Sequence, residues 1–139
     1  MGSLFTYKSF NGNKTVEELE YNMLTYKTRI EYLESELVFF NFLLDKNIFE
    51  SRIMNLFENL ALFKKEISFL NKTRKTILND LTKHAGQLAT KIECDDLACD
   101  YYFINKHDEL EENILHFFLK TTLFKNKIIE FIESVIKKE

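Results

Sequence analysis

The fold is decided by residues 16–44, which read VEELEYNMLTYKTRIEYLESELVFFNFLL. The apolar residues that recur here at steps of three and four are Val16, Leu19, Met23, Tyr26, Ile30, Leu33, Leu37, Phe40 and Leu44. Because an α-helix turns once in 3.6 residues, this spacing keeps the apolar side chains on one face over many turns. The stretch therefore predicts a long helix that packs lengthwise against a neighbour.

Two later stretches, residues 49–88 and 103–135, repeat the same spacing. Four polar residues occupy positions in these apolar seams: Arg74, His84, His107 and Thr121. The chain contains no Pro, and only Gly86 falls inside a seam, near its end. Since Pro and Gly are the residues that most destabilise a helix interior, the composition agrees with three long helices.

The three seams predict an all-α fold, an elongated antiparallel up-down-up three-helix bundle with coiled-coil-like packing. We expect an irregular N-terminal lead followed by a single bundle. The predicted ranges are 1–14 for the lead, 15–139 for the bundle, and about 15–44, 48–90 and 96–137 for its helices.

Polar residues mark where two of these helices begin. Thr15 and Glu18 have the spacing of a capping box, in which each side chain bonds to the other's backbone N–H. Asp95 and Asp96 are suitable caps for the third helix, since acidic side chains stabilise a helix N-terminus.

The first reversal of the chain is predicted at the polar trio Asp45-Lys46-Asn47. The apolar phase changes there, because Phe49 and Ile53 do not continue the first seam. Asn47 and Glu50 could then cap the second helix. The trio contains neither Gly nor Pro, so one continuous, locally distorted helix over residues 15–90 stays open as an alternative.

Composition narrows the function classes. The chain has 139 residues and a net charge of −3, which gives no general attraction for nucleic acid, and we predict no nucleic-acid partner. The richest apolar run, residues 37–44, is too short to cross a bilayer, and no signal-peptide pattern is visible. Cys94 and Cys99 are spaced so that they face different sides of a helix, and we expect free thiols in a reducing, cytoplasmic compartment.

The N-terminal residues Met1-Gly2-Ser3-Leu4-Phe5-Thr6 match the N-myristoylation pattern at Gly2. The pattern is short and occurs often by chance. A single acyl chain would also give only marginal membrane attachment, so we do not expect a membrane partner.

No motif for nucleophilic catalysis or for phosphate or dinucleotide binding occurs in the sequence, so we predict a non-enzymatic protein without a cofactor. The most suggestive polar residues are His84 and His107, which antiparallel packing places at similar heights on neighbouring helices. Glu111 shares a helix face with His107. We expect hydrogen-bonded core residues and no metal; the alternative is a metal or small-ligand site near His84 and His107 with Glu111 as a further ligand.

The stronger functional signal is a surplus of apolar residues at one end of the predicted bundle. Phe39, Phe42 and Leu43 lie off the first seam, and Phe118 lies on a second apolar line of the third helix. Apolar surface that a core cannot absorb usually marks an interface. We therefore predict a scaffold, adaptor or assembly subunit that self-associates or binds a protein partner through these residues.

Overall fold

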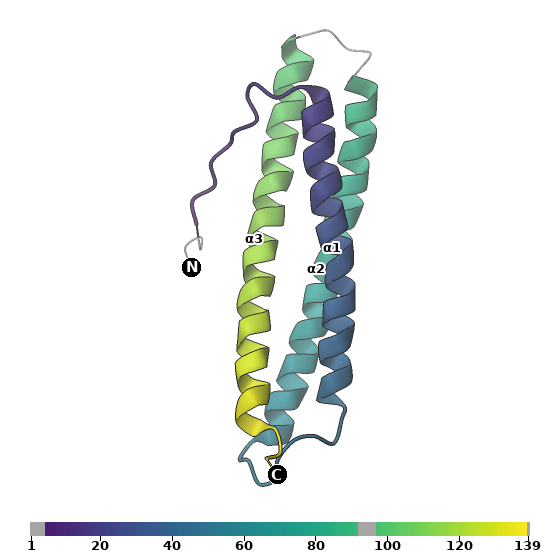
Figure 1. The fold of residues 1–139 in the computed structure, drawn as a ribbon. Helices are drawn as coiled ribbons and strands as arrows, with labels where there is room; N and C mark the ends of the chain where they lie inside the picture. Colours follow the sequence, from purple (N-terminus) through teal and green to yellow (C-terminus); the bar gives the residue numbers. More distant parts are fainter. Residues whose placement is uncertain (1–4, 92–96, 139) are drawn as a thin grey trace.

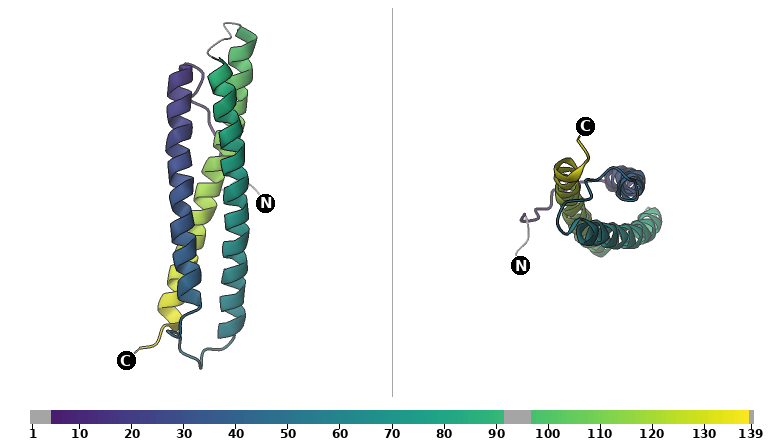
Figure 2. Two further views of the ribbon diagram at one scale, coloured as in Figure 1. Left: turned by 90° about the vertical axis from the view of Figure 1, so that its right-hand side faces the viewer. Right: turned by 90° about the horizontal axis from the view of Figure 1, so that it is seen from below.

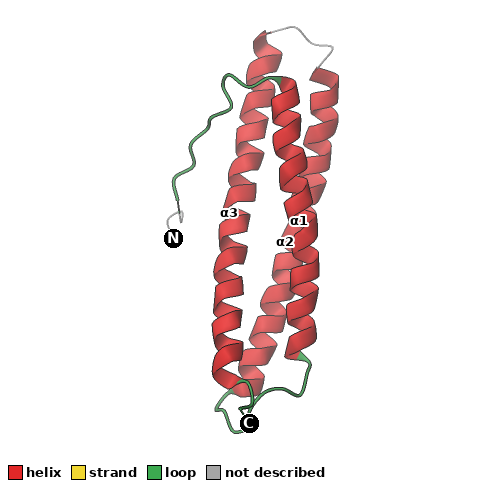
Figure 3. Cartoon of the chain, viewed as in Figure 1, coloured by secondary structure: helices red, strands yellow, loops and turns green. Residues whose placement is uncertain are grey.

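The computed structural model describes residues 5–91 and 97–138, and the side chains of residues 5–87 and 101–138. Over these ranges the chain forms three helices and no strand: α1 (Val16–Leu44), α2 (Leu56–Lys91) and α3 (Leu97–Val135). Each helix runs antiparallel to the one before it, and all three lie side by side along one long axis (Figures 1 and 3). The predicted all-α three-helix bundle is confirmed.

The predicted start of α1 is also confirmed. The Thr15 hydroxyl accepts a hydrogen bond from the Glu18 N–H at 3.2 Å, and the Glu18 carboxylate accepts one from the Thr15 N–H at 3.1 Å. This capping box satisfies two backbone donors that the first helical turn would otherwise leave unpaired.

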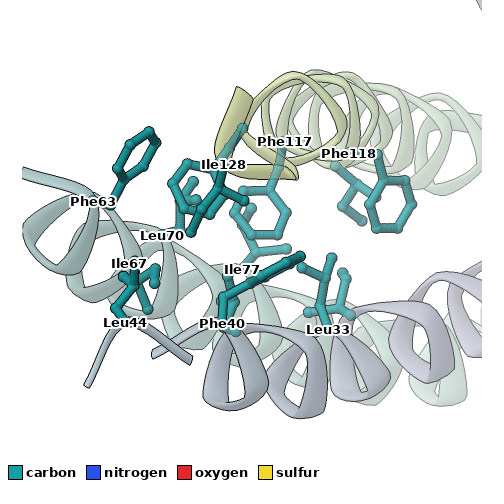
Figure 4. Close-up of a cluster of buried hydrophobic side chains, with 14 of the residues drawn as sticks. Leu33, Phe40, Leu44, Phe63, Ile67, Leu70, Ile77, Phe117, Phe118 and Ile128 are labelled. Atoms are coloured by element: carbon teal, nitrogen blue, oxygen red, sulfur yellow. The ribbon is translucent and has the colours of Figure 1, made fainter. Parts of the chain in front are cut away.

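The core consists of the side chains that the seam spacing selects. Those from all three helices point toward one another in the close-up of Figure 4. Rings join the helices near the base of the bundle: Phe124 on α3 meets Phe63 on α2 at 6.1 Å and Phe40 on α1 at 6.5 Å between centroids. Phe side chains have no polar atom to satisfy, so they fill this dry interior without an unpaired donor.

The three helices form an arc with α2 in the middle. Viewed along the axis in Figure 2, α1 and α3 stand on either side of α2. The backbone of α2 approaches both neighbours along its length, whereas α1 and α3 approach each other only marginally. Long side chains bridge the α1–α3 gap: Lys125 pairs with Glu36 at 2.9 Å, and the Arg29 guanidinium lies 3.9 Å from the Phe118 ring centroid.

The connection between α1 and α2 is longer than predicted. The chain does reverse after α1, which rules out the continuous helix over 15–90, but α2 begins at Leu56 and not near 48. Within the loop, the Glu50 N–H donates to the Val135 carbonyl at 2.7 Å, and Ile48 accepts from the Lys137 N–H at 2.8 Å.

The physical reason for the late start of α2 is that this loop closes the base of the bundle. Phe49 pairs in an isolated antiparallel bridge with Ile136, and its side chain is only 5% exposed. A helix beginning near residue 48 would use the Ile48 carbonyl internally and would hold Phe49 in a helical conformation, which would remove the bridge to Ile136. Asn55, with a φ of 59°, adopts the left-handed conformation just before α2. The predicted cap at Asn47 and Glu50 is therefore wrong.

We expect Phe49→Ala to destabilise the bundle by about 3 kcal/mol, because truncating a buried Phe leaves a cavity. Urea denaturation followed by circular dichroism measures the effect. Phe57→Ala is the matched control. Phe57 lies in the first turn of α2, at the same end of the bundle, but its side chain is 72% exposed. An equal loss of unfolding free energy in both variants would show that Phe49 does not close the base of the bundle.

Candidate functional site

Two buried imidazoles meet between α2 and α3. His84 Nε2 lies 3.2 Å from His107 Nδ1, and the two side chains are 4% and 0% exposed. Both residues occupy seam positions, so antiparallel packing of the two helices brings them together, as the sequence predicts. One ring donates and the other accepts, with roles set by their tautomers.

Glu111 extends this pair toward α1. Its Oε2 lies 3.9 Å from His107 Nε2 and accepts a hydrogen bond from the Tyr26 hydroxyl at 2.8 Å. Its Oε1 accepts from the Tyr7 hydroxyl at 2.6 Å and from the Asn11 amide at 3.1 Å. The three sequence candidates His84, His107 and Glu111 thus lie in one polar cluster, which also contains three residues that sequence reasoning missed.

The N-terminal segment supplies much of this cluster. The segment first lies beside α3 and then crosses α3 to reach the start of α1 (Figure 1). Asn11 is completely buried, and its amide also donates to Asp108 Oδ1 at 2.6 Å. Tyr7 and Ser9 reach the same Asp108 oxygen at 3.2 Å and 2.7 Å, and the Phe5 ring stacks on His116 at 4.3 Å. Although it is not helical, the predicted irregular lead is therefore docked against the bundle.

Burial sets the protonation of the cluster. It lowers the pKa of His84, and burial together with the positive charge that His84 would carry lowers the pKa of His107 to about 4. Burial and the Glu111 carboxylate raise the pKa values of Tyr7 and Tyr26 above their ordinary range. At neutral pH the cluster therefore holds two neutral imidazoles and two protonated phenols that donate to one carboxylate.

The cluster leaves specific polar atoms unpaired. Within the described part of the chain, the buried side-chain atoms with no hydrogen-bond partner are Asn11 Oδ1, His84 Nδ1 and His107 Nε2. The nearby Glu111 carboxylate favours the His107 tautomer with its proton on Nε2. His84 then donates from Nε2, which leaves a lone pair on its Nδ1.

The polar cluster has only part of what a ligand site needs. A cleft of about 270 Å³ lies between α2 and α3 beside His84, and its lining includes Asp80, Lys83, Lys106 and Glu109. Over the residues with described positions, no three His, Cys, Asp or Glu side chains are arranged to hold a metal ion. The geometry therefore gives the metal interpretation no support beyond the imidazole pair itself.

The predicted partner residues separate into two groups. Phe39 and Phe42 are 54% and 53% exposed, and Leu43 is half-buried. Phe118 is only 6% exposed, because it lies under the Arg29 guanidinium and beside Tyr26 in the α1–α3 gap. In the single chain Phe118 therefore lies in the core, and it also lines the groove between α1 and α3, so its assignment to a partner surface stays a prediction.

The outward face of α1 carries a second line of uncharged residues at helical spacing. All of its members are exposed: Tyr21, Leu24, Thr28, Tyr32, Ser35, Phe39 and Phe42. We call this line the outer stripe of α1. The outward face of α2 is different, since Lys65, Lys72 and Lys83 lie along it. Thus α1 is apolar toward the core and substantially apolar toward solvent.

A groove of about 490 Å³ runs between α1 and α3 next to the outer stripe. It is lined by Tyr21, Tyr32 and Arg29 from α1 and by Phe118 and Lys125 from α3, among others. The groove follows from the arc of the helices, because the backbones of α1 and α3 approach each other only marginally.

A scan against protein-family models, a search of curated proteins and a search of solved structures each return no match. Over the described ranges, the helices lack a segment both long and apolar enough to cross a membrane. Gly2, Cys94 and the predicted caps Asp95 and Asp96 lie outside the described residues, and the side chain of Cys99 is not described.

We expect the bundle to lose stability on acidification below pH 6.5. His107 has an ordinary pKa of 6.5 in the unfolded chain and about 4 in the folded chain, so in this window the unfolded chain binds the additional proton. The free energy of unfolding should fall by up to about 1.4 kcal/mol per pH unit from this residue. Urea denaturation between pH 7 and pH 4.5 measures it.

The control for this pH dependence is His107→Gln, which removes the titrating group. The stability of the wild type should fall relative to that of His107→Gln as the pH decreases. Parallel curves for the two proteins would contradict the assignment of a buried, neutral imidazole.

Proposed function

We propose that the chain is a non-enzymatic interaction protein, a scaffold, adaptor or assembly subunit, that binds a protein surface through the outer stripe of α1. The observation that carries this proposal is that α1 is apolar on two opposite faces. An apolar face of a helix is normally buried against a neighbour. In the single chain only one of these faces is covered.

The dimensions of the outer stripe suit a protein partner. The stripe extends from Tyr21 to Phe42, which is about 33 Å of helix at 1.5 Å per residue. No charged side chain interrupts it, and Tyr and Phe supply large contact areas at low cost in side-chain entropy. Scattered apolar residues on a surface are ordinary, but a continuous exposed line of them is typical of interfaces.

We also place the protein in the cytoplasm, on the composition of the chain. Its two cysteines are spaced poorly for a disulfide, which fits a reducing compartment. An interaction role needs no cofactor, and the proposal includes neither a nucleic-acid nor a membrane partner.

A second candidate function is binding of a metal or small ligand beside His84. It is favoured by one observation, the buried His84 Nδ1 without a hydrogen-bond partner next to a cleft. Metal analysis of the purified protein tests it. Stoichiometric metal that disappears in His84→Ala would support this candidate, and a fully folded, metal-free protein would count against it.

The interaction proposal predicts that Phe39→Asp weakens association while leaving the fold intact. A carboxylate within the stripe would have to be desolvated in the proposed interface, whereas in the single chain it faces water. We expect a change in unfolding free energy of about 0.5 kcal/mol or less, together with loss of the associated species in light scattering.

Phe69→Asp is the matched control, because Phe69 is 56% exposed but lies on α2. This variant should associate like the wild type. Association that persists in Phe39→Asp, or that is lost equally in both variants, would contradict the proposed role of the outer stripe.

A further inference from the structure

We propose that the partner of α1 is a second copy of this chain, bound in an antiparallel two-fold dimer with Tyr32 at the axis. In this dimer, α1 of each copy lies in the α1–α3 groove of the other. The inference rests on the proposed interaction function and specifies its partner. Three features support it: the arc of the helices, the spacing of residues on α1, and their charges.

The arc of helices occupies three of the four positions of an antiparallel four-helix bundle. In such a bundle the first and third helices lie on a diagonal, and both neighbour the second and the fourth. Here the backbone of α2 approaches both α1 and α3, while α1 and α3 meet through long side chains. The fourth position is the α1–α3 groove, and a helix placed there would run antiparallel to α1, as α1 of a two-fold partner does.

The spacing of the residues along the groove side of α1 is symmetric about Tyr32. The residues along it are Tyr21, Thr25, Thr28, Tyr32, Glu36, Phe39 and Leu43. Their successive spacings are four, three, four, four, three and four residues, which read the same in both directions. A two-fold interface requires such self-complementarity, because residue i meets residue j and residue j meets residue i.

Antiparallel pairing about Tyr32 matches residues of suitable size. Tyr21 falls opposite the partner's Leu43, and Thr25 falls opposite the partner's Phe39. The two Tyr32 side chains, each 70% exposed in the single chain, meet at the axis. The exposed rings of Tyr21, Tyr32 and Phe39 would all be covered, which accounts for the second apolar face of α1.

Charges on the groove side are also complementary in this register. Arg29 lies one residue away from the position directly opposite the partner's Glu36. The two-fold symmetry creates this pair twice. In the described part of the chain, Arg29 lies over the Phe118 ring and makes no ion pair with a carboxylate. Glu36 pairs with Lys125 of its own chain at 2.9 Å, and in the dimer it would lie between Lys125 and the partner's Arg29. Most other acidic residues of α1 point elsewhere; Glu34, for example, pairs with Arg74 of α2 at 3.4 Å.

The outward face of α2 is a poorer surface for a second copy. Lys65, Lys72 and Lys83 along it would place like charges against each other in a two-fold contact. The acidic flank of α1 that faces α2, with Glu31 and Glu34, would likewise repel itself. The groove side of α1 avoids both conflicts.

Disulfide trapping tests the position of the axis. In a Cys94→Ser/Cys99→Ser background, Tyr32→Cys should form a covalent dimer under mild oxidation, because each Tyr32 faces its own copy. Phe69→Cys, on α2, is the control and should stay uncross-linked. Tyr21→Cys and Leu43→Cys should each cross-link poorly alone and efficiently when the two variants are mixed.

Charge reversal tests the register. Arg29→Glu should raise the dimer dissociation constant about tenfold or more, since it places two acidic side chains together at two symmetric sites. The double variant Arg29→Glu/Glu36→Arg should restore most of the wild-type affinity. Analytical ultracentrifugation measures both constants.

The outcomes separate this inference from the proposed function. A dimer that Phe39→Asp dissociates, but that shows neither the Tyr32→Cys cross-link nor rescue by the double charge reversal, overturns the antiparallel arrangement and leaves the interaction function standing. A wild-type chain that stays monomeric at the highest attainable concentration overturns the inference.

Discussion

The structure depends on one constraint, which is that the apolar seam of α2 must be covered by two helices at once. Leu70 and Ile67 lie in the middle of this seam and are almost completely buried. Burial of such side chains contributes roughly 1.5–3 kcal/mol each, and it requires α1 on one side and α3 on the other. Because α2 satisfies both neighbours, α1 and α3 need not approach each other. The arc, the groove between them and the exposed second face of α1 all follow from this arrangement.

Polar residues inside the seams are accommodated by local bonds. Arg74 is 4% exposed, and its guanidinium reaches Asn71 at 2.9 Å and Glu34 at 3.4 Å. Thr121 donates its hydroxyl to the Phe117 carbonyl one turn earlier at 2.7 Å. The histidine pair is less fully satisfied, since His84 Nδ1 and His107 Nε2 have no hydrogen-bond partner and burying such atoms is costly. The N-terminal segment bonds to Glu111 beside this pair, so a segment outside the helices is tied to the polar part of the core.

Much of this fold could be predicted from the sequence, since helices and their packing faces depend on local spacing. The Thr15 capping box and the meeting of His84 with His107 follow from spacing and antiparallel order. The docking of Tyr7 and Asn11 on Glu111 could not be predicted in this way, because these contacts join residues about a hundred positions apart. Their residue types, an aromatic hydroxyl and an amide in an otherwise irregular lead, are the only local signal.

The unexpected positions of Phe49 and Phe118 have the same origin. Phe49 fits the spacing of a helical seam, but a longer-range backbone pairing with the C-terminal segment prevails over it. Phe118 fits an apolar surplus, but the width of the α1–α3 gap leaves room for it under Arg29. In both cases the sequence identifies an apolar residue correctly, and the three-dimensional arrangement decides whether a neighbour covers it.

The most direct test of this account is the set of nuclear Overhauser effects between aromatic rings in solution. The convergence of all three helices on one core predicts cross-peaks from the Phe124 ring on α3 to Phe63 on α2 and to Phe40 on α1. A spectrum in which Phe124 contacts only one of these rings would contradict a core that α1, α2 and α3 share.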